Sequence, residues 1–284
     1  MAFALASSSL AAPARVLASL GSSSSGQGDI AHHALQPAGS STVHALLYHG
    51  QYFRTFSGDH TNVGTPTCAD YFACAQDHEQ MYIAPLREAG KGVITYFHTT
   101  TSGNDTRDAL LVERLQPVSH RFVPHNSTAL IVDGYINAID LLLASGRHYD
   151  FATVLRFDLY FRLPLPELAI RWQSINLPWR AEQFQWDEGR VTSDLFAVMP
   201  SRFVGAYRDA LVQSGEFDRP DAQGTSHITD RGSGHYVYQP LSLSVGAENI
   251  HFIDRGYHGS TQDIVNASDI PEDDLFLAIL RACP

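Results

Sequence analysis

The chain has 284 residues, with 30 acidic side chains against 19 lysines and arginines and a formal net charge of −11. Its basic residues are scattered singly, which excludes the concentrated positive charge of a nucleic-acid surface. A few arginines and a divalent cation are still enough to hold a small anionic ligand. The sequence contains no apolar run near the roughly 18 to 20 residues that span a bilayer. Its three cysteines lack the spacing of a zinc site and the density of a disulfide scaffold.

The first 42 residues differ in composition from the rest of the chain. Ala and Ser dominate up to Gly26, and Arg15 is the only charged side chain before Asp29. We expect residues 1–42 to be disordered, and a targeting peptide is the alternative interpretation. Residues 43–284 contain no comparable linker and are expected to form a single domain. Three Asn-x-Ser/Thr tripeptides are compatible with a lumenal protein, so the cytoplasm and the Golgi lumen both remain open as locations.

Strand and helix patterns alternate through the first part of this domain. Continuous apolar runs predict strands at 43–48, 92–97, 117–123 and from 151 onward. Apolar positions at helical spacing predict helices at about 67–89, 106–116 and 128–145. Strands that alternate with helices indicate right-handed crossovers and a largely parallel sheet. The fold class is therefore expected to be α/β.

The periodicity changes after Pro164. The later sequence predicts a loop around Asp194, a short strand from about 195, a helix begun by Pro200 and a strand near 250–253. Acidic residues at 271–274 are expected to begin a terminal helix, because the helix dipole favours carboxylates there.

The segment from His148 to Leu168 places one carboxylate, Asp158, among aromatic and aliphatic neighbours. Burying a lone charge is expensive, so this carboxylate must be paired, hydrogen-bonded or facing a cleft. One interpretation is an ion pair with Arg156 or Arg162. The other is a ligand site, because open α/β sheets bind ligands at the carboxyl ends of their strands.

Two earlier strands also end in polar residues. The first ends at Gly50 and Gln51, shortly before Arg54, which predicts either a phosphate-facing turn or an ordinary loop. The second ends at His98, which either borders a site or is a histidine with its hydrogen bonds met in the core. If a ligand binds at these strand ends, its expected contacts are Gly50, Gln51, Arg54, His98 and Arg156.

The chain resembles nucleotide-sugar-dependent glycosyltransferases of the GT-A fold in an ordered series of segments: HGQYFRTF, YFHTT, YDFATVLRFDLYF, VTSDLFAVMPSRF and HFIDRGYHGST. The series extends over residues 43 to about 265. The resemblance implies a Rossmann-like, mainly parallel central sheet flanked by helices, with a mixed C-terminal portion. It also implies transfer of a sugar from a nucleotide-diphosphate donor to a carbohydrate or glycoconjugate acceptor, with the strand-end residues named above as the donor contacts.

In that family a short acidic motif, usually Asp-x-Asp, holds a divalent cation against the donor diphosphate. The matching element here is Arg156-Phe157-Asp158, in which arginine replaces the first carboxylate. Mg²⁺ or Mn²⁺ bound by Asp158, phosphates and waters would stabilise the departing nucleoside diphosphate. Alternatively, Arg156 supplies a fixed positive charge and a bidentate phosphate contact. His258 matches the position of a histidine that many such enzymes use as a further metal ligand.

Asp158 and Asp194 are the candidate catalytic residues. Asp194 suits a general base for the acceptor hydroxyl if it lies within hydrogen-bond reach, and a turn or helix-cap aspartate is the alternative. Asp187 and Glu188 are further candidates for the same role. The competing function is a catalytically silent protein that binds carbohydrate or nucleotide on the same fold.

Overall fold

The computed structural model describes residues 42–53, 71–124, 131–178, 192, 196–217, 235–253, 263–264 and 277–280. Contacts divide the chain into two units, 1–39 and 40–284, and every described residue belongs to the second. The predicted disordered or targeting segment at 1–42 therefore lies outside the described residues, apart from Thr42. Within the described ranges, no helix combines the length and the apolar character needed to cross a membrane.

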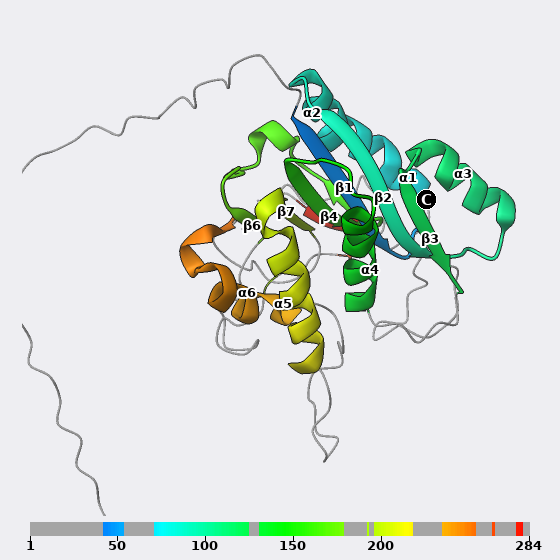
Figure 1. Cartoon of the computed structure of the whole chain (residues 1–284). Coiled ribbons are helices and arrows are strands. Elements are labelled where there is room, and N and C mark those ends of the chain that lie inside the picture. The colour runs from blue at the N-terminus through cyan, green and yellow to red at the C-terminus, as the bar shows by residue number, and fades with distance from the viewer. Residues whose placement is uncertain are drawn as a thin grey trace, which may run out of the picture. The chain divides into compact units, whose positions relative to one another are not determined.

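A seven-stranded sheet in the order β3-β2-β1-β4-β7-β6-β8 forms the centre of the fold (Figure 1). Its strands are β1 (Val43–Gly50), β2 (Gly92–Thr100), β3 (Ser119–Val123), β4 (Phe151–Arg156), β6 (Ile175–Leu177), β7 (Phe196–Pro200) and β8 (Ile250–Phe252). The first four are parallel, whereas β7 runs antiparallel to both β4 and β6. The predicted α/β class and mainly parallel sheet are confirmed.

Helices cover both faces of this sheet. They are α1 (Tyr71–Asp77), a π-helical segment (His78–Ile83), α2 (Ala84–Glu88), α3 (Asp105–Leu115), α4 (Ile131–Ala144), α5 (Val204–Phe217) and α6 (Tyr238–Val245). Alternate residues of β1 point to opposite faces, so Leu46 packs with α1, α2 and α3, while Leu47 packs with α4, α5 and α6. Figure 1 shows α4 in front of the sheet with α5 beside it, and α1 and α2 behind.

A second, three-stranded sheet has the order β5-β10-β9. It consists of β5 (Leu159–Phe161), β10 (Leu277–Leu280) and β9 (Asp263–Ile264). The expectation of a terminal helix is wrong for 277–280, which pairs antiparallel with β5; residues 271–274 lie outside the described ranges. A four-residue apolar run has no readable periodicity, and here pairing with the edge of β5 decides its conformation.

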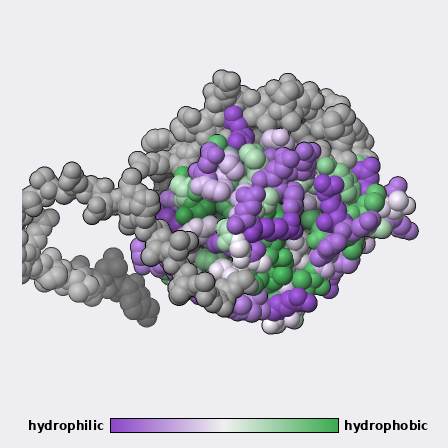
Figure 2. All heavy atoms as spheres, turned by 90° about the horizontal axis from the view of Figure 1, so that it is seen from above, coloured by the Kyte–Doolittle hydropathy of each residue, from purple (hydrophilic) through white to green (hydrophobic). Residues whose placement is uncertain are grey.

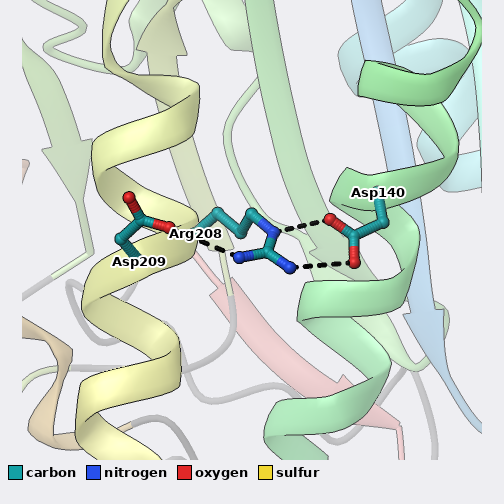
Figure 3. A network of polar contacts seen from close by, with 3 residues as sticks. All are labelled: Asp140, Arg208 and Asp209. Atoms are coloured by element: carbon teal, nitrogen blue, oxygen red, sulfur yellow. Dashed lines mark hydrogen bonds and ion pairs between the residues drawn. The ribbon is translucent and has the colours of Figure 1, made fainter.

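An ion-pair network joins α4 to α5 on one face of the sheet. Arg208 donates to both oxygens of Asp140, from Nε at 2.6 Å and from Nη2 at 3.2 Å, and also to Asp209 at 3.3 Å (Figure 3). These side chains are partly exposed, so water screens the attraction and we expect a modest contribution to stability. The fork geometry chiefly fixes how the two helices face one another.

Hydrophobic side chains at the described surface are dispersed. In the view from above, hydrophilic residues are interspersed with smaller hydrophobic areas over the described part of that face (Figure 2). The large exposed hydrophobics come from separate elements: Leu110, Leu143, Leu163, Val212 and Leu243. Such scattered apolar residues are normal for protein surfaces.

Asn176 organises the far side of the central sheet, where β6 lies between β7 and β8. Its side chain is completely buried, and its Oδ1 accepts from the Arg171 backbone N–H at 2.7 Å. Its Nδ2 donates to the carbonyl oxygens of Arg171, Ser174 and Val198 at 3.0, 2.9 and 3.2 Å. The Asn176 amide therefore satisfies backbone groups of the segment that precedes β6 and of β7.

Replacing Asn176 with Ala should destabilise the fold by about 2 to 4 kcal/mol, because several buried backbone groups lose their partner together. The measurement is the free energy of unfolding in urea. Asn249→Ala is the control, since Asn249 is partly buried and its Nδ2 makes one hydrogen bond, to the Val245 carbonyl. A loss at Asn176 no larger than at Asn249 would contradict this role.

Candidate functional site

The strand order reverses between β1 and β4. From β1 the chain moves outward to β2 and β3, then returns through α4 to β4 on the other side of β1. The helical region after β1 packs on one face of the sheet and α4 packs on the opposite face. In open α/β sheets such a reversal leaves a crevice at the carboxyl ends of the two strands, where ligands bind.

Four of the residues expected to contact a donor lie at this edge. In the parallel register, His49 is the partner of His98 on one side and of Arg156 on the other. Partners in register point to the same face of a sheet, so these side chains form a row across β2, β1 and β4. Gly50 follows His49 with φ +87°, a conformation that favours glycine, and half-buried Gln51 comes next.

His49 was not among the residues singled out from the sequence. Its side chain is completely buried, and neither ring nitrogen has a hydrogen-bond partner among the described residues. The ring lies against Tyr135 of α4, and a Cβ at Gly134 would contact its Nδ1 at 3.7 Å. Burial and the Arg156 guanidinium lower the pKa of His49 well below its ordinary value. A neutral imidazole with unmet hydrogen-bonding capacity thus lies beside the crevice.

His98 is also buried, with 4% of the residue exposed. Burial, and then the charge of Arg121, lower the pKa of His98, while Asp133 opposes the shift. His98 is therefore a neutral hydrogen-bonding group at neutral pH rather than a cation. In the row of side chains, the permanent positive charge comes from Arg156.

Arg156 and Asp158 form a bidentate ion pair in the turn between β4 and β5. Arg156 Nε donates to Oδ1 at 2.8 Å and Nη2 donates to Oδ2 at 2.6 Å. The two side chains are only 12% and 3% exposed. The ion pair that one sequence interpretation expected is present, and a ligand-binding role for Asp158 stays a prediction.

The geometry of this pair bears on the predicted divalent cation. Both oxygens of Asp158 accept hydrogen bonds from Arg156, so a cation would have to displace the guanidinium from at least one of them. Within the described ranges, no three His, Cys, Asp or Glu side chains gather as potential metal ligands. His258 lies outside the described residues, and the divalent cation stays a prediction.

Two consecutive side chains hold the strand that follows Asp158. Asp77 Oδ2 accepts from the Phe161 backbone N–H at 2.7 Å, and His78 Nε2 donates to the Leu159 carbonyl at 2.7 Å. Burial lowers the pKa of His78 to about 4, although the Leu159 carbonyl and the Asp158 charge oppose the shift. These two contacts satisfy backbone groups of β5, and β10 pairs with the same strand. Together they position the turn that contains Asp158.

Asp108 of α3 anchors the loops that leave β1 and β2. It accepts hydrogen bonds from the Tyr52 hydroxyl, from the Thr101 hydroxyl and from the backbone and hydroxyl of Ser102. Burial alone would raise the pKa of Asp108, but these hydrogen bonds lower it. Tyr52 follows Gln51 directly, so Asp108 fixes the loop that begins at Gly50.

The structure thus brings five of the predicted residues to one edge: Gly50, Gln51, His98, Arg156 and Asp158. Arg54, Asp194 and His258 lie outside the described residues, as do Asp187 and Glu188. Their roles stay predictions. The contributions of His49, Asp77 and His78 become visible only through partners that lie far away in the sequence, and so does the bond from Tyr52 to Asp108.

Comparison of the chain with protein-family models found no match. Comparison with curated proteins found no significant similarity.

A double-mutant cycle should show that Arg156 and Asp158 stabilise each other. We expect Arg156→Met to cost about 3 kcal/mol, because it leaves a buried carboxylate without its guanidinium partner. Asp158→Asn should cost less, and the double variant should cost less than the sum of the two. The measurement is the free energy of unfolding in urea.

The control cycle uses the exposed pair Arg87 and Glu79, whose side chains are 58% and 47% exposed. We expect a coupling there of about 0 to 0.5 kcal/mol. Additive effects at Arg156 and Asp158 would mean that their contact contributes nothing to folding.

The stability of the protein should depend on pH through Asp77. Burial raises the pKa of Asp77 from 3.8 to about 7, although the Phe161 N–H opposes the shift. Between these two values the folded state binds more protons than the unfolded chain. The contribution of this group is therefore largest at low pH and falls as the pH rises toward about 7.

Asp77→Asn keeps the acceptor for Phe161 without titrating. Relative to this variant, the wild type should lose stability as the pH rises from about 4 to about 7, the interval between the unfolded and the folded pKa, and should change little above it. Thermal unfolding of both proteins across this range is the measurement. The buried histidines titrate alike in both proteins and cancel in the difference, so parallel profiles would contradict the assignment.

Proposed function

We propose that this chain is a nucleotide-sugar-dependent glycosyltransferase of the GT-A type. It would move a sugar from a nucleotide-diphosphate donor to a carbohydrate or glycoconjugate acceptor. The observation that carries the proposal is the reversal of strand order between β1 and β4, with Gly50, Gln51, His98, Arg156 and Asp158 at the carboxyl ends of the strands around it.

The topology supports a site for a phosphorylated nucleotide. The order β3-β2-β1-β4 matches the corresponding strands of the dinucleotide-binding fold, whose ligand phosphates lie at the reversal of strand order. Because α4 connects two parallel strands, its N-terminus lies at their carboxyl edge, where the helix dipole favours an anion. Gly134, in the first turn of α4, lies next to the backbone N–H of Gly50.

The chemistry of sugar transfer fits these residues. Negative charge builds on the departing nucleoside diphosphate as the glycosidic bond breaks, and fixed donors near that charge lower the barrier. Arg156 supplies a planar guanidinium suited to phosphate, and Asp158 orients it. His98 and His49 supply neutral hydrogen-bonding groups beside it. On the acceptor side, Asp194 is the proposed general base.

One observation favours the second candidate, a catalytically silent protein that binds carbohydrate or nucleotide. Both oxygens of Asp158 are engaged by Arg156, so the one carboxylate of the predicted motif is already neutralised. Such a protein would bind a nucleoside diphosphate but would neither transfer nor hydrolyse a donor sugar. Turnover therefore separates the two candidates.

The test of function measures nucleoside diphosphate released from UDP- and GDP-sugars, with and without saccharide acceptors. We expect turnover, and we expect Arg156→Ala and Asp158→Asn each to lower it by about a hundredfold or more, as loss of a principal electrostatic group does. Arg87→Ala, on an exposed helical surface, should leave turnover unchanged.

Calorimetric titration with UDP and GDP completes the test. Tight binding without turnover would support the silent binding protein, and absence of both would refute the proposal. Repeating the titration with Mn²⁺ and with a chelator tests the predicted cation. Equal affinities with Mn²⁺ and with the chelator would mean that Arg156, without a cation, balances the phosphate charge. Tighter binding with Mn²⁺ would mean that the cation opens the ion pair.

A further inference from the structure

A polar cavity of about 460 Å³ lies where the end of α1 and the π-helical segment face β5. Its volume falls within the range of about 300 to 1,000 Å³ typical of small-molecule sites. Asp77 and Gln80 line it on the helical side, and Tyr160 and Arg162 line it on the strand side. None of its lining residues belongs to the row of side chains at the carboxyl ends of β1, β2 and β4, so this cavity is a different site.

The lining combines hydrogen-bond donors and acceptors of several kinds. The carboxyl of Asp77 accepts, the guanidinium of Arg162 donates, and the amide of Gln80 does both. Tyr160 adds an aromatic ring that offers an apolar face together with a hydroxyl. This mixture suits a neutral ring that carries several hydroxyl groups.

Asp77 is the buried charged residue of this lining. Its residue is 6% exposed, and its Oδ2 accepts from the Phe161 backbone N–H, which leaves Oδ1 as the oxygen that a ligand hydroxyl would reach. None of the described cations forms an ion pair with it. A desolvated carboxyl with an open acceptor position gains substantially from a ligand hydroxyl.

The backbone of the helical wall also indicates a functional site at this cavity. The helix changes from α to π geometry at His78, directly after Asp77. Short π-helical stretches are rare and are found frequently at functional sites. At this change of geometry, Asp77 and His78 bind the backbone of Phe161 and Leu159 in β5. The helix and the strand are thereby held together along the wall of the cavity.

We propose that this cavity is a second ligand site, which binds a neutral sugar ring. The hydroxyls of the ring hydrogen-bond to Asp77, Gln80 and Arg162, and its carbon face packs on Tyr160. The site is separate from the donor crevice, and its occupation does not require the chain to be a transferase.

Ligand-observed NMR with the full chain tests the site. The probes are D-glucose, D-galactose, D-mannose and N-acetyl-D-glucosamine, each at millimolar concentration. We expect at least one of them to bind. Gln80→Ala and Asp77→Asn should each weaken its affinity by about tenfold, as expected for the loss of one good hydrogen bond. Both variants should stay folded, because Gln80 is exposed and the amide introduced by Asp77→Asn keeps an acceptor for Phe161.

Gln173→Ala is the matched control, since it removes an exposed amide that bonds to Arg202 rather than to the cavity. It should leave sugar binding unchanged. Added UDP or GDP should not displace the sugar. Absence of binding by all four sugars, equal affinities in all variants, or displacement by the nucleoside diphosphate would each overturn the proposal. None of these outcomes depends on turnover, so failure here and failure of the proposed transferase activity are distinguishable.

Discussion

The buried ion pair between Arg156 and Asp158 is the constraint on which the site region depends. It occupies the turn between the last parallel strand of the large sheet and the first strand of the small sheet. Two charges at this depth are tolerable only with good geometry and complementary hydrogen bonds, and the bidentate contact supplies both. The pair therefore fixes how the chain passes from β4 into β5, and it sets the position of the guanidinium at the carboxyl edge.

Several polar side chains in the described structure bind the backbone. Asn176 satisfies strand and turn groups, Asp108 anchors two loops, and His78 holds the edge of β5. The ring of His49 is among the buried groups without a hydrogen-bond partner in the described structure, and the carboxyl of Asp77 accepts from the Phe161 backbone through one of its two oxygens. Buried groups of this kind are costly unless something else satisfies them. They lie beside the crevice and in the cavity, the two places where we propose ligands.

The replacement of a carboxylate by Arg156 gives the proposed donor site an unusual charge arrangement. A guanidinium brings permanent positive charge to the phosphates, whereas a carboxylate has to recruit a cation first. The pair with Asp158 neutralises that charge when no ligand is bound, which offsets the cost of desolvating it. A phosphate would therefore compete with Asp158, or share Arg156 with it. This competition links ligand affinity to the same interaction that holds the turn.

The sequence by itself determined the α/β class, the first four strands and the helices α3 and α4, because their periodicity is local and each is long enough to read. It also indicated that polar residues close several strands. Only the tertiary structure decided that His49, His98 and Arg156 form one row, since strand register aligns residues from three distant segments. It alone paired 277–280 with β5 and brought Asp77 to Phe161, 84 positions along the chain. Such contacts depend on how separate elements pack, and no local pattern encodes that packing.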